Sequence, residues 1–247
     1  MRDFDLEAKD NFGRLYNYSV DSLFRELMLK DFSPFIDKGS KAKSLEIGSF
    51  DGSMTEQILS YVKDLTVVEP SASLARKLES RFKGRVKVLN STIEDYATEE
   101  KFVNIFLVHT LEHVDDPVVV LGRIKNLLAP KGRVFIAVPN ANALSRQIAV
   151  HMGLISHNSA VLESELQQGH LRTYSIDTLR RDILRANFSI EMLSGVFLKA
   201  LANFQLDAAI RHKVIGQDYI EAANSLAKIF PDFSASLVAV CRPQLGK

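Results

Sequence analysis

The stretch LEIGSFDG at residues 45–52 decides the fold of this chain. Its apolar start is typical of a buried strand, and its glycines indicate a sharp turn into a helix, where the backbone can approach a ligand closely. The run VVEP at residues 67–70 closes a second apolar segment with one acid, Glu69. An acid at the tip of the strand after such a turn can accept hydrogen bonds from ribose hydroxyls. The two segments together predict a nucleoside cofactor that lies across the strand tips.

The residues around the turn indicate which kind of nucleoside binds. A dinucleotide site needs the pattern GxGxxG, because the pyrophosphate lies on the helix N-terminus. Here the acids Glu46 and Asp51 flank the turn, and Phe50 stands where a second close glycine would fall. Acids at these positions suit a cationic ligand and disfavour a pyrophosphate. The alternative, an ordinary strand-to-helix turn without a ligand, is disfavoured by the position of Glu69.

Length and charge restrict the class of protein. The chain has 247 residues, enough for one large domain or for one domain with an insert. Its net charge of +1 gives no indication of a surface for nucleic acid or for an anionic membrane. No apolar run approaches the roughly 20 residues that a membrane span needs, and the charged N-terminus has no apolar signal region, so we expect a cytoplasmic protein. The single cysteine, Cys241, excludes an internal disulfide, and its apolar surroundings predict a buried, inert thiol.

Strands and helices alternate after an amphipathic helix at 21–37. The expected strands are 43–47, 65–69, 86–89, 103–108 and 133–138. The expected helices between them are 53–63, 71–82, 94–98 and 117–128. This alternation predicts an α/β fold with a doubly wound parallel sheet and helices on both faces. Its ligands should lie at the carboxyl ends of the strands.

The regular pattern breaks after residue 140, which divides the chain into four parts. We expect an N-terminal helical lid, a cofactor-binding core, an insert that covers the substrate, and a C-terminal part of the core: 1–40, 41–140, 141–174 and 175–247. The last part begins with a helix at 177–186 and contains two antiparallel strands at 188–198 and 235–241. A partly helical segment at about 199–232 lies between these two strands.

Several sequence blocks resemble one enzyme family. Residues 45–52 resemble motif I of the class I S-adenosylmethionine-dependent methyltransferases, (V/L)-(L/D)-(E/D)-x-G-x-G-x-G, with Phe50 in place of the second glycine. The block NSTIED at 90–95 resembles the family's loop after the third strand. FLVHTLEHVDDP at 106–117 is close to the LEHxxDP signature of the ubiquinone-biosynthesis-like branch, the methyltransferase domain 23/11 type, and GHLRTYS at 169–175 resembles that branch's GHxRxYS block. The resemblance implies a Rossmann-like sheet of seven strands, mostly parallel with the last strand antiparallel.

The resemblance also implies the cofactor and its site. The cofactor would be S-adenosylmethionine, and the product S-adenosylhomocysteine. The residues expected to bind it are Glu46, Gly48, Ser49, Asp51, Gly52, Glu69, Pro70, Thr92, Ile93, Val108 and His109. Among them, Glu46 would face the ammonium group near the sulfonium, Glu69 the ribose, and Ile93 the adenine. Plain core packing is the alternative for Ile93, and a solvated turn hydroxyl is the alternative for Thr92.

Histidines are the candidate catalytic residues. An alcohol nucleophile must lose its proton during methyl transfer, and a histidine suits that task. His113, expected to open the helix after the fourth strand, and His170, in the covering insert, are the candidate bases; helix capping is the alternative for His113. Residues expected to cover the site or to contact the substrate are Tyr16, Tyr18, Arg172 and Tyr174. No metal is expected, because the acids Asp115 and Asp116 suit a helix N-terminus.

The sequence therefore predicts an S-adenosylmethionine-dependent methyltransferase that acts on a small molecule, at a hydroxyl oxygen. Alternatives are a small-molecule N-methyltransferase and a non-catalytic S-adenosylmethionine-binding module. A nicotinamide-dependent oxidoreductase is disfavoured by the acids around the turn. We expect no nucleic-acid partner and no membrane span. A homodimer is possible, and the apolar stretch 196–210 has two alternative roles, the interface of such a dimer or core packing.

Overall fold

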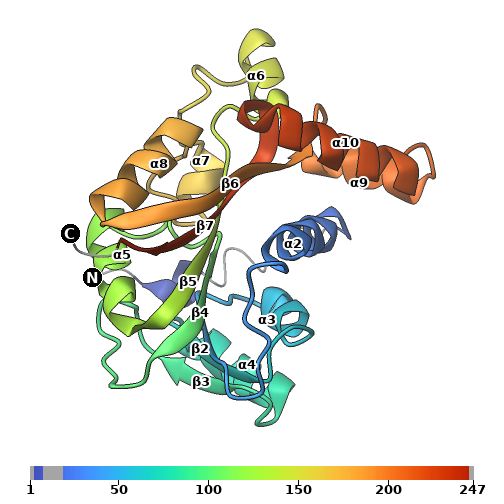
Figure 1. Cartoon of the computed structure of the whole chain (residues 1–247). Helices are drawn as coiled ribbons and strands as arrows, with labels where there is room; N and C mark the ends of the chain where they lie inside the picture. The colour runs from blue at the N-terminus through green and yellow to red at the C-terminus, as the bar shows by residue number, and fades with distance from the viewer. Residues whose placement is uncertain (1–2, 8–18, 245–247) are drawn as a thin grey trace.

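Seven strands pair into a single sheet at the centre of the molecule (Figure 1). The computed structural model describes residues 3–7 and 19–244. In chain order the strands are β1 (Lys43–Ile47), β2 (Asp64–Glu69), β3 (Lys87–Asn90), β4 (Phe102–Val108), β5 (Leu128–Pro139), β6 (Phe188–Leu198) and β7 (Ser234–Pro243). They lie in the order β3-β2-β1-β4-β5-β7-β6. Only β7 runs antiparallel to its neighbours, so the predicted sheet, mostly parallel with the last strand antiparallel, is confirmed.

Helices cover both faces of the sheet. They are α2 (Ser19–Phe32), α3 (Ser53–Ile58), α4 (Ala72–Phe82), α5 (Pro117–Leu127), α6 (Leu144–His151), α7 (Glu163–Leu166), α8 (Ile176–Arg185), α9 (Asn203–Arg211), α10 (Gln217–Ile229) and the short 3₁₀ helix η1 (Pro231–Phe233). One core cluster joins α2, α3, α4, α9 and α10 to the sheet, and the other joins α5 and α8 to its opposite face. Along β4, Phe106 belongs to the first cluster, whereas Ile105 and Leu107 belong to the second. The strands are therefore buried on both faces, as parallel strands between helices are.

The sheet has its switch point at β1, which pairs with β2 on one side and with β4 on the other. Connections leave β1 and β4 in opposite directions there, which opens a crevice at the carboxyl ends of the strands. Gly52 lies at φ +78°, and a Cβ at this position would come within 2.7 Å of Leu78 on α4. The turn after β1 thus needs glycine at this position, both for its backbone and for close packing on α4.

Several expected elements differ from the structure. The helix predicted at 94–98 is wrong: the Thr92 side chain accepts from the backbone of Asp95 and closes a single turn, after which the chain extends toward β4. The helix predicted at 21–37 ends at Phe32, just before Pro34. Residues 129–132, which separate the expected helix 117–128 from the expected strand 133–138, lie inside β5, where the pairing with β4 shifts register.

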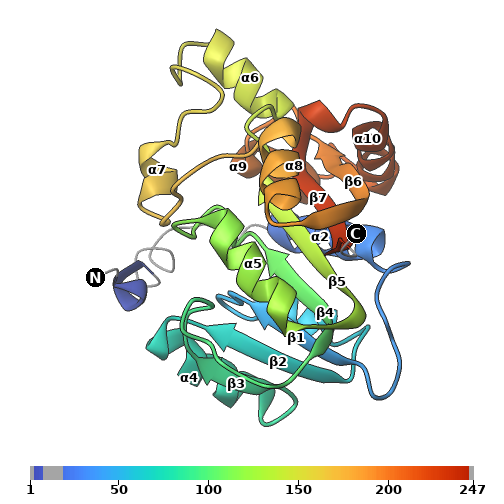
Figure 2. The same ribbon diagram turned by 60° about the vertical axis from the view of Figure 1, so that its left-hand side comes forward.

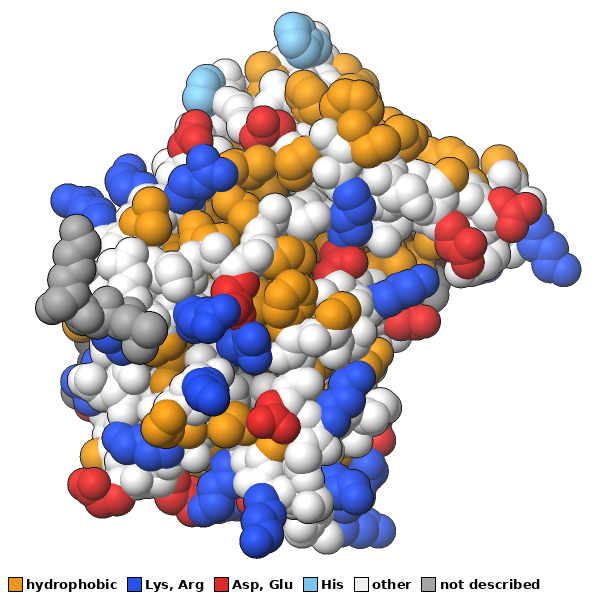
Figure 3. Space-filling view, viewed as in Figure 1, with side chains coloured by type: hydrophobic (Ala, Val, Ile, Leu, Met, Phe, Trp, Pro, Cys, Tyr) orange, Lys and Arg blue, Asp and Glu red, His pale blue; other side chains and the backbone are white. Residues whose placement is uncertain are grey.

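The C-terminal insertion is a pair of helices between β6 and β7. Sequence periodicity predicted one partly helical segment there, and the structure divides it at residues 212–216 into α9 and α10. The pair projects at the right of Figure 1. Figure 3 shows hydrophobic side chains gathered along the upper edge, over α6 and α10, and basic and acidic side chains interspersed below them. In the described residues, no helix is long and apolar enough to cross a membrane; the cytoplasmic location stays a prediction.

Candidate active site

A cavity of about 580 Å³, partly open to solvent, lies at the carboxyl ends of β1, β2 and β4. Its lining residues are Phe4, Glu7, Gly48, Phe50, Glu69, Pro70, Ser71, Leu74, His109, Thr110, His113 and Gln168. Two carboxylates are among these described residues, and no Lys or Arg is. The charge of the lining suits a cationic ligand.

Glu69 joins the two segments that the sequence singled out. One carboxylate oxygen accepts from the backbone N–H groups of Ser49 (3.1 Å) and Phe50 (3.0 Å), and the other accepts from Ser71 (3.0 Å). Burial raises the pKa of Glu69, although these hydrogen bonds oppose the shift. A carboxylate has about four lone-pair positions, so Glu69 holds the turn in place and keeps acceptor capacity toward the cavity.

Phe50 occupies the position where the family motif has a glycine. Its φ is +50°, in the left-handed region that glycine favours. Its side chain lines the main cavity and also a second hollow beside α4. His109, at the tip of β4, also has a left-handed backbone, with φ +53°, and lines the same cavity. Both residues line the cavity, so their backbone conformations shape its wall.

The other predicted cofactor residues fall into two groups. Gly48 and Pro70 line the cavity with Glu69 and His109. Ser49 donates its backbone N–H to Glu69, Asp51 accepts from Ser53 at the start of α3, and Gly52 packs on α4. These three turn residues lie outside the cavity lining, and so do Glu46, Thr92, Ile93 and Val108.

Glu46 is buried behind the turn, where it is only 1% exposed. Its carboxyl accepts from the Thr55 hydroxyl at 2.6 Å. Burial raises the pKa of Glu46 to about 8, and the charge of Glu69 adds to the shift. Direct contact between Glu46 and the cofactor stays a prediction.

Ile93 and Thr92 have the surroundings expected for their alternative roles, core packing for Ile93 and a turn hydroxyl for Thr92. Ile93 is 4% exposed and belongs to the core cluster on the α5 face. The Thr92 hydroxyl bonds Asp95 within its turn. Their predicted contacts with adenine stay predictions.

The N-terminal residues and the insert both reach the cavity. Residues 4–7 form one helical turn, and Phe4 and Glu7 from it line the cavity. Asp5 accepts from the Ser71 hydroxyl (2.6 Å) and from the Ser73 N–H (2.9 Å) at the start of α4. From the insert, Gln168 lines the cavity just after α7, and Figure 2 shows α7 and the N-terminal turn on the same side of the molecule. Tyr16 and Tyr18, predicted to cover the site, lie outside the described residues.

Two sequence blocks meet beside the cavity: the loop 110–116 after β4, and the insert segment 169–175. The Arg172 guanidinium donates to the backbone carbonyls of Leu111, Val114 and Asp115. The Leu171 N–H donates to the Glu112 carbonyl at 3.0 Å. Arg172 therefore has a structural contact with this loop, and it lines a separate hollow with Tyr174 rather than the main cavity. The Tyr174 side chain is 1% exposed, and burial raises the pKa of its hydroxyl.

Three histidines and one acid gather where these blocks meet. The His113 and His170 rings pack edge to face, with 4.6 Å between their centroids. His109 Nδ1 lies 3.3 Å from a carboxylate oxygen of Glu112, which is fully buried. Burial lowers the pKa of His170, so its imidazole tends to be neutral. Burial alone would raise the pKa of Glu112, but the neighbouring histidines outweigh it and lower that pKa.

His113 does not open the helix that follows. α5 begins at Pro117, and its N-cap is Asp116, which accepts from the N–H groups of Val118 and Val119. The expectation that His113 starts this helix is wrong, because Asp116 and Pro117 are the stronger start signal. His113 lies instead in the loop before the helix and lines the cavity.

Sequence reasoning missed several cavity residues. Ser71 is the N-cap of α4, and Leu74 lies one turn further along that helix. Thr110 donates its hydroxyl to the Ile47 carbonyl at 2.7 Å, and a Cβ on Gly48 would come within 2.9 Å of that hydroxyl oxygen. Ser71 could have been predicted from the sequence, because a serine before a helix is a typical N-cap. No local sequence pattern indicates Phe4 or Gln168.

Comparison with known proteins gives the family. A family described as "Methyltransferase domain" matches residues 19–193 of the chain. The chain belongs to this family. The prediction of a class I, S-adenosylmethionine-dependent methyltransferase is therefore confirmed. A search of curated proteins found no sequence that matches this methyltransferase.

Solved structures share the fold of this methyltransferase over nearly its whole length. The N-methyltransferase NodS from Bradyrhizobium japonicum WM9, in complex with S-adenosyl-l-homocysteine, is 14% identical, with a TM-score of 0.62 over 98% of this chain and 99% of that chain. The 1,6-didemethyltoxoflavin-N1-methyltransferase from Burkholderia thailandensis, with 1,6-didemethyltoxoflavin and S-adenosylhomocysteine bound, is 16% identical, with a TM-score of 0.61 over 97% and 84%. The plantazolicin methyltransferase BpumL, also with S-adenosylhomocysteine, is 14% identical, with a TM-score of 0.59 over 97% and 90%. At these identities the similarity establishes the fold.

Proposed function

We propose that this methyltransferase methylates a hydroxyl oxygen of a small-molecule acceptor. The observation that carries the proposal is one cavity that combines an acidic lining with a cluster of histidines at its edge. When bound, S-adenosylmethionine supplies a methyl group on a positively charged sulfonium. The acceptor would enter between the insert and the N-terminal turn, which both contribute to the lining.

The residues that line the cavity suit this cofactor. Glu69 would accept the ribose hydroxyls with the capacity left by its backbone hydrogen bonds, and Gly48 would let the backbone pass under the methionine part. Phe50 and Leu74 supply apolar surface for the adenine. Glu7 adds a second negative charge, which favours the sulfonium and ammonium groups.

Proton removal is assigned to the histidines. His113 lines the cavity, and His170 contacts its ring from the insert. A base near the acceptor must lie within hydrogen-bond reach of the hydroxyl. The position of His113 at the cavity supports it as the nearer candidate, and His170 would orient it or take its place.

N-methylation is the second candidate chemistry. Two of the structures with this fold are described as N-methyltransferases. An amine nucleophile needs less help from a base, so this chemistry would leave turnover less dependent on the histidines. A third candidate, a module that binds S-adenosylmethionine without turnover, would bind the cofactor and methylate nothing.

The first experiment is calorimetric titration of the full-length protein with S-adenosylmethionine and S-adenosylhomocysteine, with NAD as the control. Micromolar binding of the first two without binding of NAD is the expected result. Absence of binding would contradict the proposed cavity. A screen of hydroxyl and amine acceptors with methyl-labelled cofactor then separates the three candidates.

Variants test the assigned roles. Replacement of His113 or His170 by alanine should lower turnover more than cofactor affinity. The control is His151→Ala, because His151 is exposed on α6 and lies outside the cavity lining. Unchanged turnover in both variants would remove the histidines from the reaction and favour an amine acceptor.

A further inference from the structure

Glu112, in the loop after β4, has unusual surroundings for a carboxylate. Its side chain is 0% exposed, and neither carboxylate oxygen accepts a hydrogen bond from the described residues. Buried carboxylates normally have hydrogen-bond partners or coordinate metals, because an unpaired buried charge is strongly unfavourable. His109 Nδ1, at 3.3 Å from Oε1, is one neighbouring group. The two oxygens are therefore placed to bind a ligand with positive charge.

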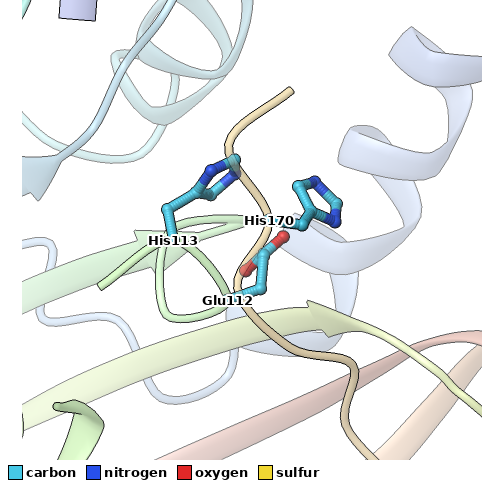
Figure 4. A group of neighbouring side chains, drawn as sticks. All are labelled: Glu112, His113 and His170. Atoms are coloured by element: carbon cyan, nitrogen blue, oxygen red, sulfur yellow. The ribbon is translucent and has the colours of Figure 1, made fainter. Parts of the chain in front are cut away.

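Two imidazoles converge on this carboxylate from different parts of the chain. His113 comes from the same loop as Glu112, and His170 comes from the insert, as Figure 4 shows. One ligand atom from each of Glu112, His113 and His170 lies within 4.8 Å of the other two. The Nδ1 atom of His170 is also buried without a hydrogen-bond partner among the described residues. The site thus places a fully buried carboxylate beside two imidazoles, each with a ligand atom close to it.

From this geometry we propose that Glu112, His113 and His170 bind one divalent transition-metal cation. Two imidazoles and one carboxylate suit Zn²⁺, Fe²⁺, Mn²⁺ or Co²⁺, whereas Mg²⁺ and Ca²⁺ prefer oxygen ligands. Ligands about 2.0–2.2 Å from such an ion lie roughly 3–3.5 Å apart, so small side-chain rotations would close the present spacing. This inference departs from the sequence analysis, which predicted no metal because Asp115 and Asp116 suit a helix N-terminus.

The cation would lie next to the cavity, because His113 belongs to both. Three protein ligands leave a coordination position open, as in catalytic metal sites. A cation there lowers the pKa of a hydroxyl that binds to it. In this role, which rests on the proposed function, the acceptor's proton leaves to water. Its oxygen forms a bond to the methyl carbon, and the carbon–sulfur bond breaks with its electron pair on sulfur. The two histidines would then act through the cation instead of as free bases.

The test measures cation binding without cofactor or acceptor. The full-length protein is treated with EDTA, dialysed, and titrated with Zn²⁺ by calorimetry and with Co²⁺ by visible absorption. We expect one equivalent of each cation to bind, with ligand-field bands of Co²⁺ typical of a site with nitrogen and oxygen ligands. The thermal midpoint should rise on addition of Zn²⁺.

Variants locate the cation. Glu112→Gln keeps the side-chain volume and removes the charge, and His170→Gln removes an imidazole. Loss of a residue that only hydrogen-bonds to a metal ligand weakens metal binding roughly 10–100-fold. Each of these variants loses a ligand itself and should weaken cation binding by more than that. The matched controls are Glu163→Gln and His151→Ala, which change exposed residues of the same insert and should bind like the wild type. Circular dichroism of each metal-free variant shows that it is folded before it is titrated.

Two results would overturn the inference: no saturable binding by the wild type, or equal affinity in wild type and Glu112→Gln. Titration with S-adenosylhomocysteine separates this test from the proposed function. If the protein binds S-adenosylhomocysteine and no cation, the cation site is wrong and the proposed function remains. If the protein binds the cation and not S-adenosylhomocysteine, the proposed function fails and the cation site remains.

Discussion

At the scale of single residues, the site depends on polar groups and backbone conformations that the fold holds in unfavourable surroundings. Glu46 is buried with one hydroxyl partner, Glu112 is fully buried with the His109 ring 3.3 Å from one carboxylate oxygen, and Phe50 has the backbone of a glycine. Such positions lower stability and persist where the surrounding structure fixes them. Two of them give measurable predictions for the free protein.

Glu46 should make stability depend on pH. Its folded pKa is about 8, above the ordinary 4.5, so the folded state keeps a proton that the unfolded chain releases between these values. The corresponding stability is complete below pH 4.5 and is lost as the pH rises toward 8. The groups that act on Glu46 are Glu69 and Asp51, which raise its pKa, and Arg25 and Thr55, which lower it.

Glu46→Gln should remove this dependence. In that pH window the free energy of unfolding of the wild type, measured with urea, should fall by up to about 1.4 kcal/mol per pH unit. The variant should show a smaller decrease. Glu79→Gln, at an exposed acid on α4, serves as the control. Equal slopes in wild type and Glu46→Gln would contradict the assignment.

Phe50 should tolerate glycine better than a β-branched residue. The left-handed backbone at this position is easy for glycine and strongly unfavourable for valine. We expect Phe50→Gly to stay within about 1 kcal/mol of the wild type, because relief of strain offsets the lost contacts, and Phe50→Val to lose about 1–3 kcal/mol. Urea unfolding of both variants measures which of them is more stable. Equal free energies of unfolding would show that the left-handed φ does not decide which residues position 50 accepts.

At the scale of elements, two tertiary contacts hold the cover of the cavity. Asp5 fastens the N-terminal turn to the start of α4, and Arg172 fastens the insert to the loop after β4. The strands beneath are fixed by two apolar clusters, whereas these covers depend on a few polar contacts. We therefore expect the covers to open at a lower free energy than the sheet.

Asp5→Ala should free the N-terminal turn. The hydrogen bonds from Ser71 and Ser73 hold the pKa of Asp5 at about 2, so the carboxylate is charged and bonded at neutral pH. Without the Asp5 carboxylate the N-terminal turn should detach, and Phe4 and Glu7 should leave the cavity lining. Binding of S-adenosylhomocysteine should therefore weaken several-fold. Calorimetry measures the affinity, and Glu94→Ala, at an exposed acid elsewhere, is the control. Unchanged affinity would mean that residues 3–7 do not contribute to binding.

Arg172→Lys should loosen the insert while keeping the charge. A lysine cannot reproduce the fork of N–H groups that reaches three carbonyls. We expect a loss of about 2 kcal/mol in the free energy of unfolding and faster hydrogen exchange at residues 163–173. Arg185→Lys, on the exposed face of α8, should change neither. Identical exchange in Arg172→Lys and wild type would show that other contacts hold the insert.

At the scale of the whole molecule, the paired helices α9 and α10 leave large apolar side chains exposed. For the stretch 196–210, interface and core packing were alternatives: Val196 and Phe197 are buried in the core, whereas Phe204 on α9 is 60% exposed. Ile229 on α10 is 67% exposed. Exposed apolar surface of this kind is typical of protein contacts. We therefore expect that a homodimer, if one forms, uses this pair of helices and not the strand β6.

Sedimentation velocity tests the homodimer. The wild type should form a species of twice the monomer mass at micromolar concentration, and Phe204→Ser should shift it to the monomer. Leu166→Ser removes an exposed apolar side chain from α7 and should leave the dimer intact. A monomer at every concentration would contradict the prediction.

The sequence by itself determined the sheet, the glycine turn and the family, because these depend on local signals. Hydrophobic runs placed the strands to within a few residues, and the spacing from Gly48 to Glu69 predicted a site at the strand tips, where the structure has its cavity. Two helix predictions were wrong: no helix forms at 94–98, and α3 is shorter than the expected helix 53–63. Side-chain hydrogen bonds and turns end these segments, and the hydrophobic periodicity contains no signal for such an end.

Only the tertiary structure decided what surrounds the cavity. Glu112, His113 and His170 come together because Arg172 and Leu171 tie the insert to the loop after β4, and no local pattern encodes that contact. Phe4 and Gln168 likewise reach the cavity through tertiary contacts that no local pattern encodes. Chemistry between residues distant in the sequence depends on packing, and packing is settled only when the whole chain has folded.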